Sequence, residues 1–179
     1  MMSCCKMVLK FSHRPEIDSR GAVQEDIQYM MALESELSPI INMWSHEEHT
    51  KKIADPDVAQ IIIEVDSKPI GYVIVQGLTS PHVLTITRLA VAVPRQGYGR
   101  AIINSIIDYA FYTKSYNRLW LDVLTTNEVA YQLYLSMGFT LEGTLRENEY
   151  HEGRYYSYHI LSILQREYAL ENSLKESSK

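Results

Sequence analysis

Two glycines near the middle of the chain lie where a phosphate group could be held. Gly97 and Gly99 follow an apolar stretch rich in β-branched residues and precede a pattern typical of an amphipathic helix. Glycines at such a junction let the backbone come close to a ligand, and the free N–H groups of the first helical turn attract phosphate. Arg95 and Arg100 would strengthen this attraction. The same spacing also serves as a simple turn.

Two familiar nucleotide-binding loops do not fit this segment. A P-loop ends in Gly-Lys-Ser or Gly-Lys-Thr, and no such ending is present. A dinucleotide fingerprint needs a third glycine and a βαβ unit, whereas the strands expected before Gly97 form hairpins. The segment therefore indicates phosphate binding of another kind.

Other reactive side chains give weaker signals. In His46-Glu47-Glu48-His49 the histidines are three apart, while the zinc-protease pattern puts them four apart, so we favour a solvated helix face. No serine or cysteine lies in a nucleophile elbow. Cys4 and Cys5 are adjacent, which disfavours a mutual disulfide, and two thiols are too few for a structural zinc site. We expect no metal.

The hydrophobic periodicity predicts one mixed sheet flanked by helices. Ser45 and Glu48 have the spacing of a capping box at the start of a short helix. In chain order, the expected elements are a strand at 7–11, helices at 23–37 and 46–55, strands at 61–65, 70–76 and 83–93, a helix over 102–110, a strand at 119–123, a helix at 128–137, and strands at 139–145 and 156–164.

The composition is that of a single globular domain. The 179 residues are 46% hydrophobic and 22% charged, which is enough to bury a core without disulfides. We expect one domain over 1–179, with disordered tails at 1–6 and 171–179. No membrane span or secretion signal is evident, so we expect a cytoplasmic protein. The formal charge of −5, without a Lys/Arg cluster, argues against a nucleic-acid partner.

The glycine loop and a later block resemble the GNAT family of N-acetyltransferases. Gln96-Gly97-Tyr98-Gly99-Arg100-Ala101 matches the glycine half of the family's acetyl-CoA loop, Q/R-x-x-G-x-G/A, with Pro94 at its first position. The block from Asn127 to Phe139 matches N-x-x-A-x-x-x-Y-x-x-x-G-F and is the more specific signal. Two further segments, 142–146 and 153–156, resemble the ribosomal-protein and spermidine acetyltransferase branch.

The resemblance implies a GNAT fold of the α/β (α+β) class, in which a mixed central sheet of about seven strands is flanked by helices. Two splayed strands of that sheet bind acetyl-CoA. It also implies direct acetyl transfer to a primary amine in a ternary complex, without a covalent enzyme intermediate. The residues implied to bind acetyl-CoA are Leu89, Ala90, Val91, Gln96, Gly97, Tyr98, Gly99, Arg100, Ala101, Asn127, Ala130 and Tyr134.

The chemistry of these residues suits acyl transfer. Tyr134 is similar to the family's tyrosine acid, which protonates the departing thiolate, and a phenol with its ordinary pKa near 10 is protonated at neutral pH. The backbone N–H groups of 89–91 would stabilise charge on the thioester oxygen. Asn127 resembles the residue that bonds the pantetheine arm or an ordered water. For the general base, Glu64 and Asp122 are both candidates, although for each carboxylate we favour a solvated or structurally paired role.

The identity of the acceptor stays open. Between Glu16 and Glu48 the chain carries eight acidic residues and one basic residue, Arg20. An acidic wall would attract a polyamine or a basic protein N-terminus, whereas a solvated helix face explains the same charges. The tyrosine-rich stretch 150–158 predicts aromatic edges that line either the acceptor pocket or a subunit contact, so a homodimer also stays open. A non-catalytic acetyl-CoA sensor and an unrelated phosphate-binding domain are the alternatives.

Overall fold

The computed structural model describes residues 7–37, 43–80 and 82–169. Within these residues, seven strands form one mixed sheet, in which their order is β1, β2, β3, β4, β5, β7, β6. The strands are β1 (Ile17–Gly21), β2 (Val58–Val65), β3 (Lys68–Gln76), β4 (Val83–Val91), β5 (Arg118–Leu124), β6 (Thr140–His151) and β7 (Arg154–Leu164). The helices are α1 (Ile27–Leu37), α2 (His46–Ala54), α3 (Tyr98–Asp108) and α4 (Glu128–Ser136), with short helical turns at 24–26 and 109–113. The expected fold class is confirmed.

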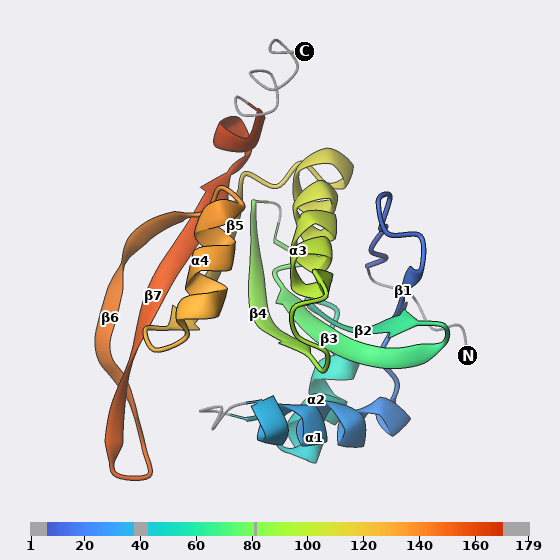
Figure 1. The fold of residues 1–179 in the computed structure, drawn as a ribbon, viewed down its shortest axis with the longest axis horizontal. Coiled ribbons are helices and arrows are strands. Elements are labelled where there is room, and N and C mark those ends of the chain that lie inside the picture. Colours follow the sequence, from blue (N-terminus) through green and yellow to red (C-terminus); the bar gives the residue numbers. More distant parts are fainter. Residues whose placement is uncertain (1–6, 38–42, 81, 170–179) are drawn as a thin grey trace.

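The two faces of the sheet are covered by different helices. Along β2, Ile61 and Ile63 belong to the core that contains the buried side of α3, whereas Ile62 packs with Met30 and Leu33 of α1. Successive side chains of a strand point to opposite faces. Helices α3 and α4 therefore cover one face, and α1 and α2 cover the other (Figure 1).

The local signals at the helix ends are confirmed. Ser45 accepts a hydrogen bond from the backbone N–H of Glu48, whose carboxylate accepts one from the backbone N–H of Ser45 at 2.7 Å. Helix α4 stops before Gly138, which has a φ of +91°. Helix α2 thus begins, and helix α4 ends, where the residue types predict.

The strand expected at 7–11 is wrong, because the first strand is β1 and residues 7–11 are irregular. The pattern still marked buried side chains, since Met7 and Leu9 lie in the core. The backbone of Leu9 bonds the side chain of Ser19 instead of a strand: its N–H donates to Ser19 Oγ at 3.3 Å, and Ser19 Oγ donates to its carbonyl at 3.2 Å. The predicted tails, including Cys4 and Cys5, lie outside the described residues.

Candidate active site

Strands β4 and β5 are paired over only half of β4. Their parallel pairing begins at Val83 and ends at Ile86, opposite Leu121, although β4 continues to Val91. A bulge follows at Thr87, which has no partner in the register with β3. The stretch 89–91 therefore pairs with β3 alone and leaves its other backbone edge available. This is the splay that the resemblance implied.

The glycine loop leads from the splayed end of β4 into α3. Gly97 is the N-cap of α3 and has a φ of +77°, a conformation that favours glycine. Gly99, in the first helical turn, has no such constraint. A Cβ atom built on Gly99 would meet only Leu133 Cδ2 of α4, at 3.6 Å. The protein itself leaves room for a side chain there, so this glycine suits the close approach of a ligand.

The family's loop pattern fits better when it is counted from Gln96. Gly99 and Ala101 then take its fourth and sixth positions, and no position departs from the pattern. The structure favours this register because Gly97 serves as the helix cap, while Gly99 is the glycine that faces α4. Pro94 lies before the pattern rather than in its first position.

A cation that the sequence did not indicate supports the loop. Arg14 Nη1 donates to the carbonyl oxygen of Gln96 at 3.1 Å, and its guanidinium lies 5.1 Å from the ring centre of Tyr98. Arg14 and Gln96 are 82 residues apart, so no local pattern could have joined them. Arg100, which was expected at the loop, donates to Ser136 Oγ at 2.7 Å and links α3 to the end of α4.

The expected asparagine has a structural role as well. Asn127 is the N-cap of α4, and its Oδ1 accepts a hydrogen bond from the backbone N–H of Ala130 at 3.2 Å. Capping therefore uses the carbonyl of this side chain and leaves its NH₂ group for another partner. Ala130, in the first turn of α4, packs against the main core.

Tyr134 has the environment of a proton donor. Its side chain is 8% exposed, and its ring packs against Phe139 with 5.8 Å between ring centres. No hydrogen bond joins its hydroxyl to any of the described residues. Burial raises the pKa of Tyr134 to about 12, with a contribution from the negative charge of Asp122. The hydroxyl therefore keeps its proton at neutral pH.

The two candidate bases lie in different parts of the sheet. Asp122 is the first β5 residue beyond the last pair with β4, and it is close enough for its charge to act on Tyr134. Asp122 is exposed at the surface, yet partial desolvation by the surrounding protein raises its pKa, and the charge of Glu149 adds to this effect. Glu64, on β2, accepts a hydrogen bond from Arg20 Nε at 2.9 Å. The structure thus brings Asp122, and not Glu64, to the splay.

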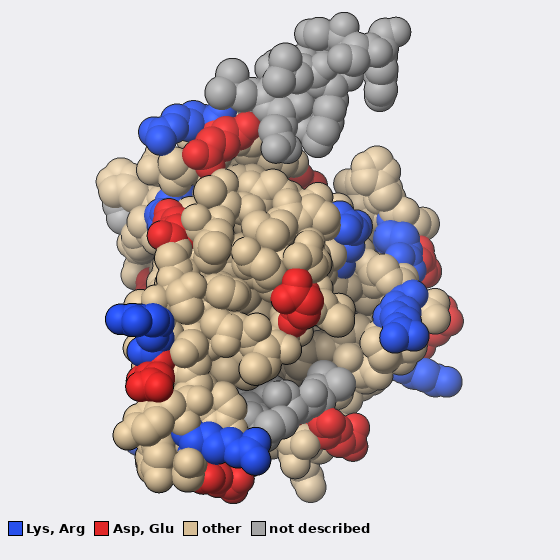
Figure 2. Space-filling view, turned by 60° about the vertical axis from the view of Figure 1, so that its left-hand side comes forward, with Lys and Arg blue, Asp and Glu red and all other residues tan. Residues whose placement is uncertain are grey.

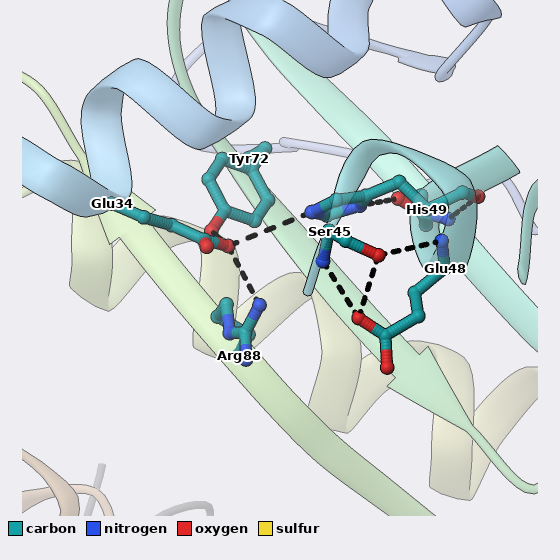
Figure 3. Close-up of polar contacts among 7 residues, drawn as sticks. Glu34, Ser45, Glu48, His49, Tyr72 and Arg88 are labelled. Carbon is teal, nitrogen blue, oxygen red and sulfur yellow. Dashed lines mark hydrogen bonds and ion pairs between the residues drawn. The ribbon is translucent and has the colours of Figure 1, made fainter. Parts of the chain in front are cut away.

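The acidic residues of the N-terminal region are mostly engaged within the protein. Glu34 of α1 is fully buried and accepts hydrogen bonds from Tyr72 and from Arg88, the latter at 2.7 Å (Figure 3). Other ion pairs join Glu16 to Arg14, Asp26 to Arg20 and Glu47 to Lys51. Four of the eight acidic residues between Glu16 and Glu48 thus have a cationic partner within the protein.

The histidine pair on α2 does not form a metal site. His49 is fully buried, with its Nδ1 at 2.7 Å from Gln60 Oε1, while Glu48 turns back to cap the helix (Figure 3). Within the described ranges, no group of three or more His, Cys, Asp or Glu side chains is arranged to hold a metal ion. No helix in the same ranges is long and apolar enough to cross a membrane.

The side formed by α4, β6 and β7 is turned forward in Figure 2, where charged side chains lie mainly round the rim of a largely uncharged surface. At the tip of the β6 and β7 hairpin, Tyr150 and Tyr155 are 62% and 64% exposed, and their ring centres are 4.9 Å apart. Tyr158, further along β7, is half-buried. The tyrosines of this stretch therefore have different surroundings.

Comparison with known proteins decides the family. The model of the acetyltransferase (GNAT) family matches residues 27–139. The chain belongs to the GNAT acetyltransferase family. It is 25% identical to spermidine N(1)-acetyltransferase of Escherichia coli over 165 residues, which cover 86% of this chain and 88% of the relative. It is 43% identical over 56 residues to the alanine N-acetyltransferase of ribosomal protein bS18 from the same species, covering 31% of this chain and 36% of the relative.

The fold of this GNAT protein also matches a solved relative. The dodecameric structure of spermidine N-acetyltransferase from Vibrio cholerae superposes with a TM-score of 0.73 and 26% identity, and the match covers 86% of this chain and 96% of the other. The chain is therefore an acetyl-CoA-dependent acyltransferase that acts on an amine, and the sheet described above is the family's fold.

Proposed function

We propose that this GNAT enzyme acetylates a primary amine at the splay between β4 and β5, with Tyr134 as the acid and Asp122 as the base. One observation carries the assignment. Tyr134 is 8% exposed, its hydroxyl has no hydrogen-bond partner among the described residues, and this hydroxyl lies within the electrostatic influence of Asp122. A protonated phenol beside a carboxylate provides the donor and the acceptor that transfer to an amine needs.

The residues present fit acetyl-CoA. Gly99 offers its backbone N–H at a place where the chain leaves room, and the first turn of α3 adds further N–H groups and the positive end of a helix dipole. Arg14 and Arg95 add positive charge near the loop. The backbone of 89–91, which is unpaired on its β5 side, would hold the pantetheine arm and the thioester oxygen, and the NH₂ group of Asn127 would bond the same arm. Bound acetyl-CoA would supply the acyl carbon that the amine attacks.

Two proton transfers fall to the protein. Asp122 accepts a proton from the acceptor's ammonium group, which frees the nitrogen lone pair for attack. The new C–N bond forms as the C–S bond breaks, Tyr134 donates its proton to the departing thiolate, and the newly formed amide nitrogen releases its second proton to solvent. Solvent then returns a proton to Tyr134 and takes one from Asp122, so the protein ends the cycle unchanged. No cysteine or metal is needed in this scheme.

A cationic acceptor, either a polyamine or a basic peptide N-terminus, fits best. The relatives named above are a spermidine acetyltransferase and an acetyltransferase of a ribosomal protein, and the longer of the two alignments is to the spermidine enzyme. The non-catalytic sensor gains no support from these relatives.

An amine panel tests the proposal. Purified protein is incubated with acetyl-CoA and with spermidine, spermine, lysine or short basic peptides, while free thiol is followed over time. We expect thiol release that depends on both substrates, with the acetylated amine identified by mass spectrometry. Binding of acetyl-CoA by calorimetry without thiol release from any amine would contradict the enzyme assignment.

We also propose that the protein self-associates, at least as a homodimer. Support comes from the exposed aromatic tip formed by Tyr150 and Tyr155 and from the oligomeric structural relative. Sedimentation equilibrium of the parent and of a Tyr150→Ser, Tyr155→Ser variant would measure the mass of each. A monomeric parent would dismiss this part of the proposal.

A further inference from the structure

Three polar side chains on β5, β6 and β7 share the face opposite α3. Asp122 lies opposite Ile160 in the antiparallel register of β5 and β7, and Tyr158 is two residues before Ile160. In the register of β6 and β7, Glu149 lies opposite Tyr156, which shares the face of Tyr158. Residues directly opposite each other on paired strands point to the same face of the sheet. Along one strand, every second side chain points to that face. Asp122, Tyr158 and Glu149 therefore lie together, from three adjacent strands.

A hydrogen bond fixes one end of this group. The hydroxyl of Tyr158 donates to Glu149 Oε2 at 2.7 Å. Burial raises the pKa of Tyr158, and the charge of Glu149 raises it further, so the hydroxyl stays a donor. The other oxygen of Glu149 has no bond to any of the described residues. Tyr158 thus holds Glu149 in place and leaves half of its carboxylate available.

The charge of this group is not balanced by the protein. Glu149 and Asp122 act on each other electrostatically, yet no Lys, Arg or His nitrogen of the described residues lies within ion-pair distance of either carboxylate. Glu142, which is also on β6, does have a cationic partner, because Arg118 Nη2 of β5 donates to its Oε2 at 2.6 Å. Two neighbouring carboxylates without a cation repel each other, and a cationic ligand between them would relieve the repulsion.

The hydroxyl of Tyr134 is a second, independent sign of a ligand. It belongs to a side chain that is more than nine-tenths buried, it comes from α4 on the other face of the sheet, and it lacks a hydrogen-bond partner among the described residues. Asp122 lies at the point where β4 and β5 part, and its charge acts on both Tyr134 and Tyr158. In the proposed function the reacting nitrogen of the acceptor would lie at Asp122, with Glu149 two strands away on the same face of the sheet.

We infer that Glu149, held by Tyr158, is a subsite for a second cationic group of the acceptor, so that the enzyme prefers diamines and polyamines to monoamines. This inference rests on the proposed function, because it takes Asp122 as the position of the reacting amine. It assigns Glu149 to specificity and not to the proton transfers. A carboxylate held by a neutral donor can bind an ammonium group directly through its free oxygen.

The test compares two acceptors that differ only in the second amine, 1,4-diaminobutane and butylamine. We expect Glu149→Gln to lower kcat/KM for the diamine by at least about tenfold, mainly through KM, because a charge-assisted contact is lost. The value for butylamine should change by less than about twofold. Tyr158→Phe should lower kcat/KM for the diamine by a smaller factor, and it should also change kcat/KM for butylamine by less than about twofold.

Glu152→Gln is the matched control, since it removes the same charge from the exposed turn of the same hairpin. An equal loss in this variant would mean that only the long-range field attracts the diamine, and it would overturn the subsite. Equal losses for both amines in Glu149→Gln, or no loss for the diamine, would also overturn it. Circular dichroism and acetyl-CoA affinity confirm that each variant is folded.

The failure of this inference can be told apart from failure of the proposed function. A parent protein that releases no thiol with either amine contradicts the proposed function itself. A parent that acetylates the diamine and leaves butylamine untouched supports the subsite, and Glu149→Gln should then reduce the diamine reaction selectively in KM.

Discussion

Arg88 of β4 donates to Glu34 of α1 across 2.7 Å, in a position where the carboxylate is completely buried. The guanidinium of Arg88 also lies 5.2 Å from the ring centre of Trp44, which precedes α2. Arg88 is next in sequence to the 89–91 stretch of β4. The ion pair therefore ties α1, and the contact with Trp44 ties the segment before α2, to the strand that is proposed to hold acetyl-CoA.

Loss of Glu34 should destabilise the fold strongly. Glu34→Ala leaves the guanidinium of Arg88 without its buried partner and removes the acceptor of the Tyr72 hydroxyl. Breaking a buried pair from one side costs about 3 to 5 kcal/mol in the free energy of unfolding, which urea titration would measure. Glu36→Ala, on the exposed side of the same helix, should change it by less than about 0.5 kcal/mol. Similar values for the two variants would show that the ion pair adds little.

Replacement of Tyr134 should affect turnover and leave cofactor binding intact. We expect Tyr134→Phe to lower kcat by at least about tenfold, since a proton donor typically contributes 10²–10⁴-fold. Acetyl-CoA affinity, measured by calorimetry, should change little because the ring still packs against Phe139. Since burial raises the pKa of Tyr134 to about 12, the parent should not lose activity through this group below about pH 11. An unchanged kcat in the variant would remove Tyr134 as the acid.

The two carboxylates that the sequence left open can be separated by mutation. Asp122→Asn should lower kcat at least about tenfold, whereas Glu64→Gln should leave it within about twofold, because Glu64 is paired with Arg20 on the far side of the sheet. The reverse ranking would return Glu64 as the base.

The pH profile gives an independent reading of Asp122. A carboxylate acts as a base only when it is deprotonated, so a raised pKa moves the loss of activity on acidification above the value near 3.9 of an ordinary aspartate. Asp122→Asn should abolish this acidic limb of kcat and retain a low, flat rate. An identical limb in the parent and the variant would assign the titration to another group.

Much of the architecture could be predicted because its signals are local. The capping box at Ser45, the glycine after α4 and the β-branched apolar runs of the central strands are each signals from residues a few positions apart. The misplaced first strand shows the limit. Met7 and Leu9 are buried as a strand residue would be, but a side-chain contact with Ser19 satisfies the backbone instead of a ladder. In this segment the apolar pattern predicts which side chains are buried, but it does not show whether the backbone pairs with another strand.

The site was predictable only where a motif marked it. The loop residues and Tyr134 follow from sequence spacing, whereas Arg14 reaches the loop from a distant segment and Glu149 meets Tyr158 across a hairpin with a bulge between Leu145 and Glu149. The charge count of the N-terminal region also does not reveal that Glu34 is paired with Arg88 and Asp26 with Arg20. Net charge does not show which carboxylates already have partners.

The two loop glycines should respond in opposite ways to alanine. Gly97 has a φ of +77°, so Gly97→Ala should cost about 1 to 2 kcal/mol of stability through backbone strain. Gly99 lies in a helix with space beside it, so Gly99→Ala should leave stability unchanged or raise it by up to about 1 kcal/mol. If the loop holds the pyrophosphate of acetyl-CoA, the methyl group at Gly99 should nevertheless weaken acetyl-CoA binding by at least about tenfold in calorimetry. Full affinity in a stable Gly99→Ala protein would place the cofactor away from this turn of α3.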